Sequence, residues 1–290
     1  MAGMVMSDAD LILVDEPHHA PLSAAVVSTW RGNSVTSGTD MLAEEVPVAL
    51  EYNGISHAVM LASPTDLDDF ALGFSLSEGL IGHHSDLYEC EVLAQPNGIR
   101  IAMRISGACF AAMKDQRRNM SGRTGCGLCG AETLAQVVRT PRRVISTVRI
   151  DAARLQQAFQ EMEQQQTLQQ ATGSTHAAGW LDADGRVPLV REDVGRHNAL
   201  DKLIGALTSR STDFATGAVL ITSRASYEMV QKTAMAGIGL LAAVSAPTAL
   251  ARRLADETGI TLVGFVRGHG HVVYTHPERL CHPLPVLKSA

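Results

Sequence analysis

Hydrophobic and polar positions follow different patterns in the two halves of the chain. The first half contains four short apolar runs rich in residues that favour strands, at 46–52, 55–62, 91–95 and 99–105. An Asn-Gly pair separates the runs of each pair, at Asn53 and at Asn97. Because Asn and Gly readily adopt the tight turn that joins two antiparallel strands, this pattern predicts two β-hairpins.

A helix is predicted between the two hairpins. Four apolar residues recur there at helical spacing and would share one face: Leu67, Phe70, Ala71 and Phe74. Ser63 is the expected helix cap, and Pro64 is the expected first helical residue because its ring suits the first turn. The order in this half is therefore hairpin, helix, hairpin.

The residues before the first hairpin show no sustained period. Proline and glycine interrupt them repeatedly, at Pro17, Pro21, Gly32 and Gly38. We therefore expect an irregular arm or a loosely attached strand over residues 1–40, followed by an α+β region over residues 41–145. That region includes a basic loop at 114–130 that contains two cysteines.

From residue 146 to residue 290, strands alternate with helices. A helix begins near Asp151, carries Leu155, Phe159 and Met162 on one side and ends at Gly173, and its many glutamines are interpreted as a solvated face. Three apolar strands each lead into a helix and two more follow, at 187–190, 218–222, 239–244, 261–266 and 272–275. This order predicts a mostly parallel sheet with helices on both faces, a three-layer α/β/α domain with an antiparallel edge at the last hairpin.

Composition places the chain among ordinary globular proteins. Of its 290 residues 46% are hydrophobic and 19% are charged, and its net charge of −6 argues against a nucleic-acid-binding protein, which would carry a basic surplus. The first residues show no signal-peptide pattern, and the longest apolar tract, at 236–251, is too short to span a bilayer. We therefore expect a cytoplasmic protein with no nucleic-acid and no membrane partner.

Two cysteines, Cys126 and Cys129, lie three positions apart in the glycine-rich segment 122–130. Basic residues surround or precede them, namely Lys114, Arg117, Arg118 and Arg123, and a helix is predicted to open at Ala131. Positive charge and a helix amino terminus both favour the thiolate over the thiol, so we expect both cysteines to be nucleophilic at neutral pH. In a reducing compartment, such a pair indicates redox, metal or sulfur-transfer chemistry.

The sequence argues against two of these kinds of chemistry, metal binding and redox. A structural zinc site needs four ligands, usually from two close pairs, but this chain has one close pair and three isolated cysteines, Cys90, Cys109 and Cys281. A thioredoxin-like dithiol directly follows a strand, whereas here a basic, glycine-rich loop precedes the pair. Sulfur transfer is therefore favoured and no metal ligand is assigned, with zinc and dithiol chemistry left open on the residues alone.

Polar residues collect where the strands of the predicted sheet end. Four junctions are polar, at 191–198, 223–226, 245–248 and 267–270. Ligands of such sheets bind outside the carboxyl ends of the strands, and an arginine beside a helix amino terminus suits a phosphate. Each Ser or Asp there could equally be a plain helix cap, but together the junctions predict a phosphorylated ligand, with Arg224 and Arg267 as its candidate partners.

Four segments of the chain, in order, match the motifs of one family. They are GRTGCGLCG at 122–130, EDVGRHNALDK at 192–202, SRASYEMVQK at 223–232 and LVGF at 262–265. On these motifs the chain closely resembles the FdhD family, the sulfur carriers needed for formate dehydrogenase, over about residues 42–276.

The resemblance implies a sulfurtransferase that takes sulfur from a cysteine desulfurase as a persulfide on Cys126. It implies transfer of that sulfur to the molybdenum cofactor, in its bis-molybdopterin guanine dinucleotide form, before insertion into formate dehydrogenase. Cys129 would relay the sulfur or release it by forming a disulfide with Cys126. The cofactor, or a guanine nucleotide at the same site, would contact six residues: Phe265, Val266, Arg267, Gly268, His269 and Gly270. A cytidine deaminase-like carboxyl domain and a homodimer are also implied.

Deaminase chemistry itself is not expected. A zinc deaminase uses His-x-Glu and Pro-Cys-x-x-Cys, whereas here His176 is followed by two alanines and the junction at 223–226 contains no cysteine. A second function stays open. A chaperone that delivers the molybdenum cofactor without moving sulfur would need the phosphate site but not the cysteine pair.

Overall fold

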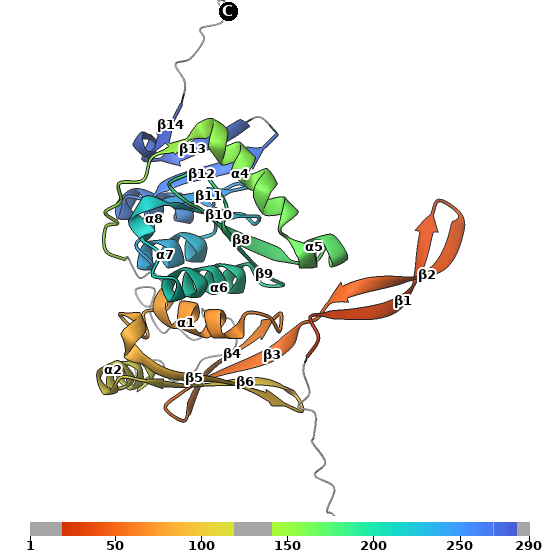
Figure 1. Ribbon diagram of the computed structural model, residues 1–290, viewed down its shortest axis with the longest axis horizontal. Helices are drawn as coiled ribbons and strands as arrows, with labels where there is room; N and C mark the ends of the chain where they lie inside the picture. Colours follow the sequence, from red (N-terminus) through yellow and green to blue (C-terminus); the bar gives the residue numbers. More distant parts are fainter. Residues whose placement is uncertain (1–18, 119–140, 269, 283–290) are drawn as a thin grey trace, which may run out of the picture.

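A six-stranded mixed sheet forms the centre of the carboxyl half (Figure 1). The computed structural model describes residues 19–118, 141–268 and 270–282. The strands, in their order across the sheet, are β13 (Gly270–Thr275), β12 (Thr261–Arg267), β11 (Leu240–Ala243), β10 (Ala218–Ile221), β8 (His176–Leu181) and β9 (Leu189–Asp193). Strands β10, β11 and β12 run parallel, β8 runs antiparallel to both of its neighbours, and β13 forms an antiparallel edge beside β12.

Helices cover both faces of this sheet. One face packs against α6 (Arg196–Ser209), α7 (Tyr227–Met235) and α8 (Ala249–Thr258), which bury Leu200, Val230 and Leu254 against sheet residues such as Val219 and Leu241. The other face packs against α4 (Ala152–Gln164), which buries Leu155 and Met162 against Leu220 and Ala242. In the ranges that the structure describes, no helix is long and apolar enough to cross a membrane. The predicted three-layer α/β/α arrangement is confirmed.

The sheet is less parallel than the sequence pattern predicts, because strand β8 is inserted between β9 and β10. Its sequence, His-Ala-Ala-Gly-Trp-Leu, contains small residues that rarely favour strands, so no strand was expected at 176–181. Antiparallel pairing on both sides leaves two parallel pairings, β10 with β11 and β11 with β12. The prediction of a mostly parallel sheet was therefore wrong on this side of β10.

The long helix expected from Asp151 to Gly173 is two helices. The first helix begins near Asp151 as expected, and Asp151 caps it, since its Oδ1 accepts a hydrogen bond from the Ala153 amide at 2.8 Å. The chain then breaks at Gln165 and Gln166 and resumes as α5 (Thr167–Thr172), which ends at Gly173 in the left-handed conformation. The carboxylate of Glu192 accepts hydrogen bonds from the amides of Leu168 and Gln169, so a residue distant in sequence fixes where α5 begins.

A four-stranded sheet forms the amino-terminal unit. Its strands, in order, are β4 (Ile55–Ala62), β3 (Val46–Tyr52), β6 (Gly98–Ile105) and β5 (Leu87–Gln95). Asn53 and Gly54 both have positive φ, 47° and 81°, as a type I′ hairpin turn requires. Both predicted hairpins are confirmed, and β3 and β6 join them by parallel pairing.

Two helices pack with this sheet. The first, α1 (Leu67–Ser77), buries Phe70 and Phe74 in the same core as Leu50 and Ile101 of the sheet. The second, α2 (Gly107–Arg118), buries Met113 there. Residues 114–118 are therefore helical and do not belong to the expected loop at 114–130, because the run that precedes them is rich in good helix formers.

The start of α1 differs from the prediction. The residue before the helix is Asp66, in the left-handed conformation, and Ser63 does not cap it. Ser63 is fully buried, its Oγ accepts a hydrogen bond from the Val194 amide, and its own amide donates to Asp193 Oδ2. A polar residue that resembles a local cap thus contacts the other half of the chain.

Helix α1 and helix α6 join the two units by direct backbone contact. A Cβ atom at Gly73 of α1 would lie 1.7 Å from the carbonyl oxygen of Asp201, and one at Gly205 of α6 would lie 1.9 Å from that of Asp69. Any side chain at either position would overlap these carbonyls. The two glycines therefore set how closely the helices approach each other.

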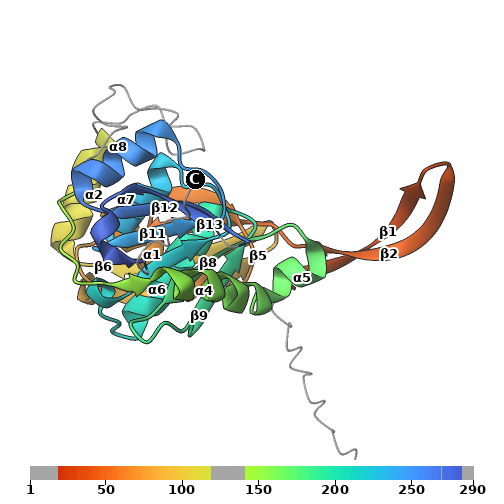
Figure 2. The same ribbon diagram turned by 90° about the horizontal axis from the view of Figure 1, so that it is seen from above.

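The segment expected to be irregular contains a regular hairpin. Strands β1 (Leu22–Arg31) and β2 (Ser34–Ala43) pair antiparallel along their whole length, with Gly32 at the turn at a φ of 61°. This hairpin, called the arm below, projects from the rest of the molecule (Figures 1 and 2). The prediction of an irregular chain was wrong over 22–40, because serine, threonine and glycine dilute the strand pattern there.

Candidate functional site

A cleft of about 710 Å³ opens at the carboxyl ends of the central strands. Its first wall is the sheet edge, formed by His176, Thr222, Val244 and residues 266–268. Its second wall comes from α4, α5 and the residues around them: Gln156, Phe159, Gln160, Met162, Glu163, Gln166, Gln169, Gly173, Ser174 and Thr175. The cleft thus lies where ligands of α/β sheets bind, at the edge that the sequence indicates.

Some of the predicted cofactor residues line this cleft and others do not. Val266, Arg267 and Gly268 line it. Phe265 and Gly270 belong to the same β12–β13 hairpin but do not line it, and His269 lies outside the described residues. Arg224 is exposed in the segment that follows β10 and is also not among the lining residues.

The backbone is irregular at the end of β12, where Val266, Arg267 and Gly268 line the cleft. Phe265 has a φ of 53°, which is unusual for a residue with a large side chain, and the register with β13 shifts between Gly264 and Arg267. A Cβ atom at Gly264 would lie 3.0 Å from Pro247 Cδ, so the backbone passes closely over the neighbouring junction. Val266 is buried while Arg267 is exposed, with its guanidinium 5.4 Å from the centre of the Phe265 ring. Such bulges redirect side chains next to binding sites.

Four glutamines that the sequence pattern assigned to a solvated face lie along the cleft: Gln156, Gln160, Gln166 and Gln169. Gln166 is only 5% exposed, and the Gln169 side-chain oxygen accepts a hydrogen bond from the Thr175 amide at 2.9 Å. Sequence reasoning missed their location. The recurrence of glutamine four positions apart, at 156 and 160, was the available signal, but it looks the same on a helix that faces solvent.

His176 stands at the start of β8 and lines the cleft. Burial lowers the pKa of its imidazole below the ordinary value, and the nearby Arg196 and His197 lower it further. The ring is therefore neutral at pH 7, with one nitrogen that donates a hydrogen bond and one that accepts. In the cleft it adds polarity without charge.

Part of the polar junction at 191–198, which was expected to bind phosphate, contacts the other unit. Arg191 pairs with Asp69 at 2.7 Å and with Asp66 at 3.3 Å, both beside or within α1. Asp193 pairs with Lys202 at 2.7 Å, and both side chains are inaccessible to solvent. The charges of Arg191 and Asp193 are therefore already paired, whereas Arg196, in the same junction, has a buried Nε without a hydrogen-bond partner in the described structure and lies near His176.

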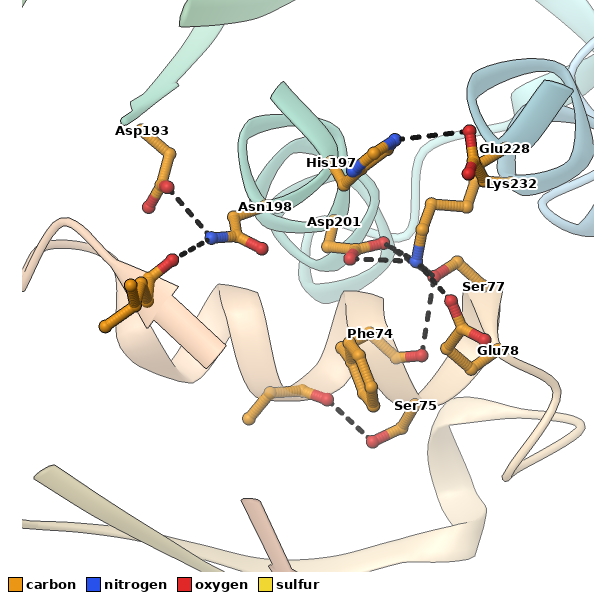
Figure 3. Close-up of polar contacts among 12 residues, drawn as sticks. Phe74, Ser75, Ser77, Glu78, Asp193, His197, Asn198, Asp201, Glu228 and Lys232 are labelled. Carbon is orange, nitrogen blue, oxygen red and sulfur yellow. Dashed lines mark hydrogen bonds and ion pairs between the residues drawn. The ribbon is translucent and has the colours of Figure 1, made fainter. Parts of the chain in front are cut away.

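Asn198 extends the contact between the units. Its Nδ2 donates to the Leu61 carbonyl at 2.8 Å and to Asp193 Oδ1 at 2.9 Å (Figure 3). Lys202 Nζ donates to the Ser63 carbonyl at 3.0 Å. The residues of the motif at 192–202 thus bind the end of β4 and the chain that follows it.

A second buried cation occurs in the motif at 223–232. Lys232 Nζ lies 3.0 Å from both carboxylate oxygens of Asp201, 2.7 Å from Glu78 Oε1 and 3.0 Å from Ser77 Oγ (Figure 3). Burial alone would lower the pKa of Lys232, but attraction to Asp201 and Glu78 outweighs it and raises the pKa. The ammonium stays charged and connects α7, α6 and the end of α1.

His197 and Glu228 meet near the amino ends of α6 and α7. Their side chains approach to 3.6 Å (Figure 3). Ser226 Oγ donates a hydrogen bond to Glu228 Oε2 at 2.8 Å. The contact with His197, followed by that with Ser226, lowers the pKa of Glu228 to about 2 despite partial burial. Glu228 is therefore a carboxylate at all physiological pH values.

The predicted catalytic residues Cys126 and Cys129, and the helix expected from Ala131, lie outside the described residues. Among the cysteines that the structure describes, Cys90 has its pKa raised to about 12 by burial and by Asp68, so it is a thiol at neutral pH. Within the described ranges, no three histidine, cysteine or acidic side chains are grouped as metal ligands would be.

Residues 144–146, which follow the cysteine segment in sequence, lie at the amino ends of the sheet strands, whereas the cleft opens at their carboxyl ends. The Val144 amide donates to the Thr258 carbonyl at 2.8 Å, and Ser146 Oγ donates to the Ala215 carbonyl at 2.7 Å. Thr258 and Ala215 precede β12 and β10, so they mark the amino ends of the strands. Residues 144–146 are therefore separated from the cleft by the length of the sheet.

Comparison with known proteins identifies relatives over nearly the whole chain. The model of the FdhD/NarQ family matches residues 43–281. The chain is 60% identical to the sulfur carrier protein FdhD of Cupriavidus necator over 90% of both chains. It is 54% identical to that of Bordetella petrii over 91% of this chain and 96% of the relative. A crystal structure from Desulfotalea psychrophila, described as a formate dehydrogenase accessory protein, superposes with a TM-score of 0.71 at 25% identity, covering 90% of this chain and all of that one. The chain belongs to the FdhD/NarQ family.

Proposed function

We propose that this protein is a sulfur carrier that serves formate dehydrogenase, with Cys126 as the residue that carries sulfur. The names of its relatives support the general role, since those at 60% and 54% identity are sulfur carrier proteins and the solved neighbour is a formate dehydrogenase accessory protein. The observation that carries the proposal is the cleft at the sheet edge, because the segment implied to bind the cofactor forms one of its walls. The protein would act in the cytoplasm, where thiols stay reduced.

The cleft suits a nucleotide-containing ligand, which we take to be the molybdenum cofactor in its bis-molybdopterin guanine dinucleotide form. Its volume of about 710 Å³ is in the range of small-molecule sites. In the described lining Arg267 is the one cation and Glu163 the one anion. A diphosphate would therefore lie toward Arg267 and the backbone of Gly268, where a guanidinium can hold two oxygens at once.

The opposite wall suits the ring systems of such a ligand. Guanine and pterin edges present donors and acceptors side by side, and a carboxamide side chain can match both. Gln156 and Gln160 line the cleft together with the nearly buried Gln166, so carboxamide groups lie where such a ligand would bind. Neutral His176 adds one donor and one acceptor without repelling Arg267.

Sulfur would reach the protein by thiol exchange with a cysteine desulfurase. The Cys126 thiolate attacks the outer sulfur of the desulfurase persulfide, a new sulfur–sulfur bond forms on Cys126, and the desulfurase thiolate leaves. Cys129 would then serve in one of two ways. It either takes the outer sulfur as a relay, or attacks the inner sulfur, forming a disulfide with Cys126 and releasing hydrosulfide for the cofactor.

Mass spectrometry of the intact protein tests the carrier role. We expect incubation with a cysteine desulfurase and cysteine to add one sulfur atom, which dithiothreitol removes. A double variant, Cys126→Ala with Cys129→Ala, should gain none, whereas Cys281→Ala, which removes an exposed cysteine in the described structure, should gain sulfur normally. Absence of the adduct in the parent chain, or its persistence in the double variant, would refute the carrier role and leave the cofactor chaperone as the function.

A further inference from the structure

A segment without regular secondary structure, residues 142–149, lies across the amino ends of the sheet strands and is called the strap below. From residue 143 to residue 149 every second residue is exposed and those between are buried or partly buried, which is the pattern of an extended chain. Val144 and Val148 are only 6% and 3% exposed and belong to the cores on the two faces of the sheet. The inward side of the strap is therefore part of the fold.

Hydrogen bonds fix the position of the strap. The Val144 amide and Ser146 Oγ bind backbone carbonyls before β12 and β10, and the Val148 amide donates to Ser146 Oγ at 3.3 Å. A Cβ atom at Gly239, just before β11, would lie 2.3 Å from Ser146 Cβ, so the strap passes directly against the sheet. A backbone held in this way presents its outward side chains with little further ordering, which lowers the entropic cost of binding a partner.

The outward side of the strap combines positive charge with an exposed apolar side chain. It presents Arg143, Ile145, Thr147 and Arg149 in a row. Ile145 is 89% exposed, the highest value for a large hydrophobic side chain in the ranges that the structure describes. Arginine is enriched at protein–protein interfaces, and apolar side chains occupy their centres, so an isoleucine between two arginines has the composition of an interaction surface.

Charge indicates which kind of partner fits this surface. The strap contains three arginines and no acidic residue, whereas the chain as a whole has a net charge of −6. The neighbouring helix α8 carries two arginines and two acidic residues, so it does not cancel the charge of the strap. A local row of positive charge attracts an acidic surface and repels a basic one. The partner should therefore present acidic side chains.

We propose that the strap is the surface on which the protein that supplies sulfur to Cys126 docks, through an acidic patch of that protein. The inference rests on the proposed function, in which the supplier is a cysteine desulfurase. The described chain resumes at residue 141, immediately before the strap, so a supplier bound there is held beside the point from which the cysteine segment is tethered. Holding two reacting proteins together raises the effective concentration of one thiol near the other.

Matched charge reversals test the proposal. Arg143→Glu with Arg149→Glu reverses both charges of the outward row, and Arg100→Glu with Arg104→Glu makes the same change on β6 in the other unit. Ile145→Asp is a third variant, which removes the apolar centre of the row. The substituted side chains all reach solvent, so every variant should keep the far-ultraviolet circular dichroism of the parent chain.

Two sulfur donors separate docking from chemistry. A desulfurase has to dock, whereas glutathione persulfide reaches the cysteine without docking, passes its outer sulfur to the Cys126 thiolate and leaves as the glutathione thiolate. The initial rate of loading is measured by intact-protein mass at limiting donor, and only sulfur that a Cys126→Ala variant does not gain is counted.

The strap variants should respond to one donor only. With the desulfurase, we expect the double reversal in the strap and Ile145→Asp to load at least about tenfold more slowly than the parent, because charge complementarity sets the rate of encounter. With glutathione persulfide, both should load at the parental rate. The double reversal on β6 should match the parent with both donors.

Three outcomes would overturn the proposal. The first is parental loading of the strap variants by the desulfurase. The second is an equal loss with both donors, which would mean that the substitutions disturb the cysteine itself. The third is a parent chain that glutathione persulfide loads and the desulfurase does not, which would assign the strap to a different protein. A parent chain that neither donor loads would refute the carrier role of Cys126, and the docking inference with it.

Discussion

Asp193 and Lys202 form an ion pair of 2.7 Å between Oδ2 and Nζ, and solvent reaches neither side chain. Asp193 also accepts hydrogen bonds from the Ser63 and Gly195 amides, so both charges are well paired. Removing one partner leaves the other charge buried without compensation. We predict that Lys202→Met lowers the free energy of unfolding by about 3–5 kcal/mol, measured by urea denaturation.

Two control variants separate this effect from a general loss of charge. Asp193→Asn with Lys202→Met should recover part of the loss, because no buried charge then remains. Arg104→Met, which breaks the exposed pair with Glu89, should change stability by less than about 1 kcal/mol. A Lys202→Met protein within about 1 kcal/mol of the parent would show that this pair does not hold the two units together.

The contact of Glu228 with His197 and Ser226 predicts a defined pH dependence. The pKa of Glu228 is lowered from 4.5 to about 2 in the folded protein, so the carboxylate stabilises the fold above pH 4.5 and loses that contribution as the pH falls toward 2. Glu228→Gln should therefore cost about 1 kcal/mol at pH 7, a value reduced for partial exposure. The difference from the parent should disappear near pH 2, and a difference that is constant from pH 7 to pH 2 would contradict this account.

The backbone contact between α1 and α6 predicts a large effect of a single methyl group. Gly73→Ala would place Cβ 1.7 Å from the Asp201 carbonyl oxygen, which belongs to a rigid helix and cannot move aside. We expect a loss of about 3 kcal/mol or more in the free energy of unfolding. Gly107→Ala, at a position with open space around it, should leave stability unchanged or raise it by up to about 1 kcal/mol. Equal effects of the two substitutions would refute the close helix contact.

Arg267 and Arg224 should differ in their effect on ligand binding. Arg267 lines the cleft and Arg224 does not, although the sequence pattern makes both candidates for phosphate. We predict that Arg267→Ala weakens binding of a guanine nucleotide by about 1.5–3 kcal/mol, the cost of losing a hydrogen bond to a charged group, whereas Arg224→Ala leaves it unchanged. Calorimetry with both variants measures this. A loss with Arg224→Ala alone would move the phosphate to the junction at 223–226.

Local patterns in the sequence predicted most of the elements. The turn at Asn53 and Gly54 and the start of α4 near Asp151 depend on residues close together in the sequence, so they could be predicted directly. Strand β8 could not, because its alanines and glycine favour no strand until β9 and β10 pair with it on both sides. The strand pairing of the arm was not predicted either, because serine, threonine and glycine dilute the strand pattern there.

The site was less predictable because its residues interact over long sequence distances. Arg191 lies in a junction where the sequence pattern predicted a phosphorylated ligand, but its partner Asp69 is known only from the fold. The cleft-facing glutamines gave no distinct pattern, since a helix facing solvent can carry the same residues. The segment 266–268, in contrast, was placed at the sheet edge by its motif, and the cleft lies there.

In the proposed function, one chain both holds sulfur on Cys126 and passes it to a cofactor bound in the cleft. Transfer of radioactive sulfur measures this directly. The chain is loaded by a cysteine desulfurase, mixed with the molybdenum cofactor, and the cofactor is then extracted and counted. We predict label on the cofactor with the parent chain, none with Cys126→Ala, and less with Arg267→Ala at limiting cofactor. Unlabelled cofactor from a fully loaded parent chain would contradict the claim.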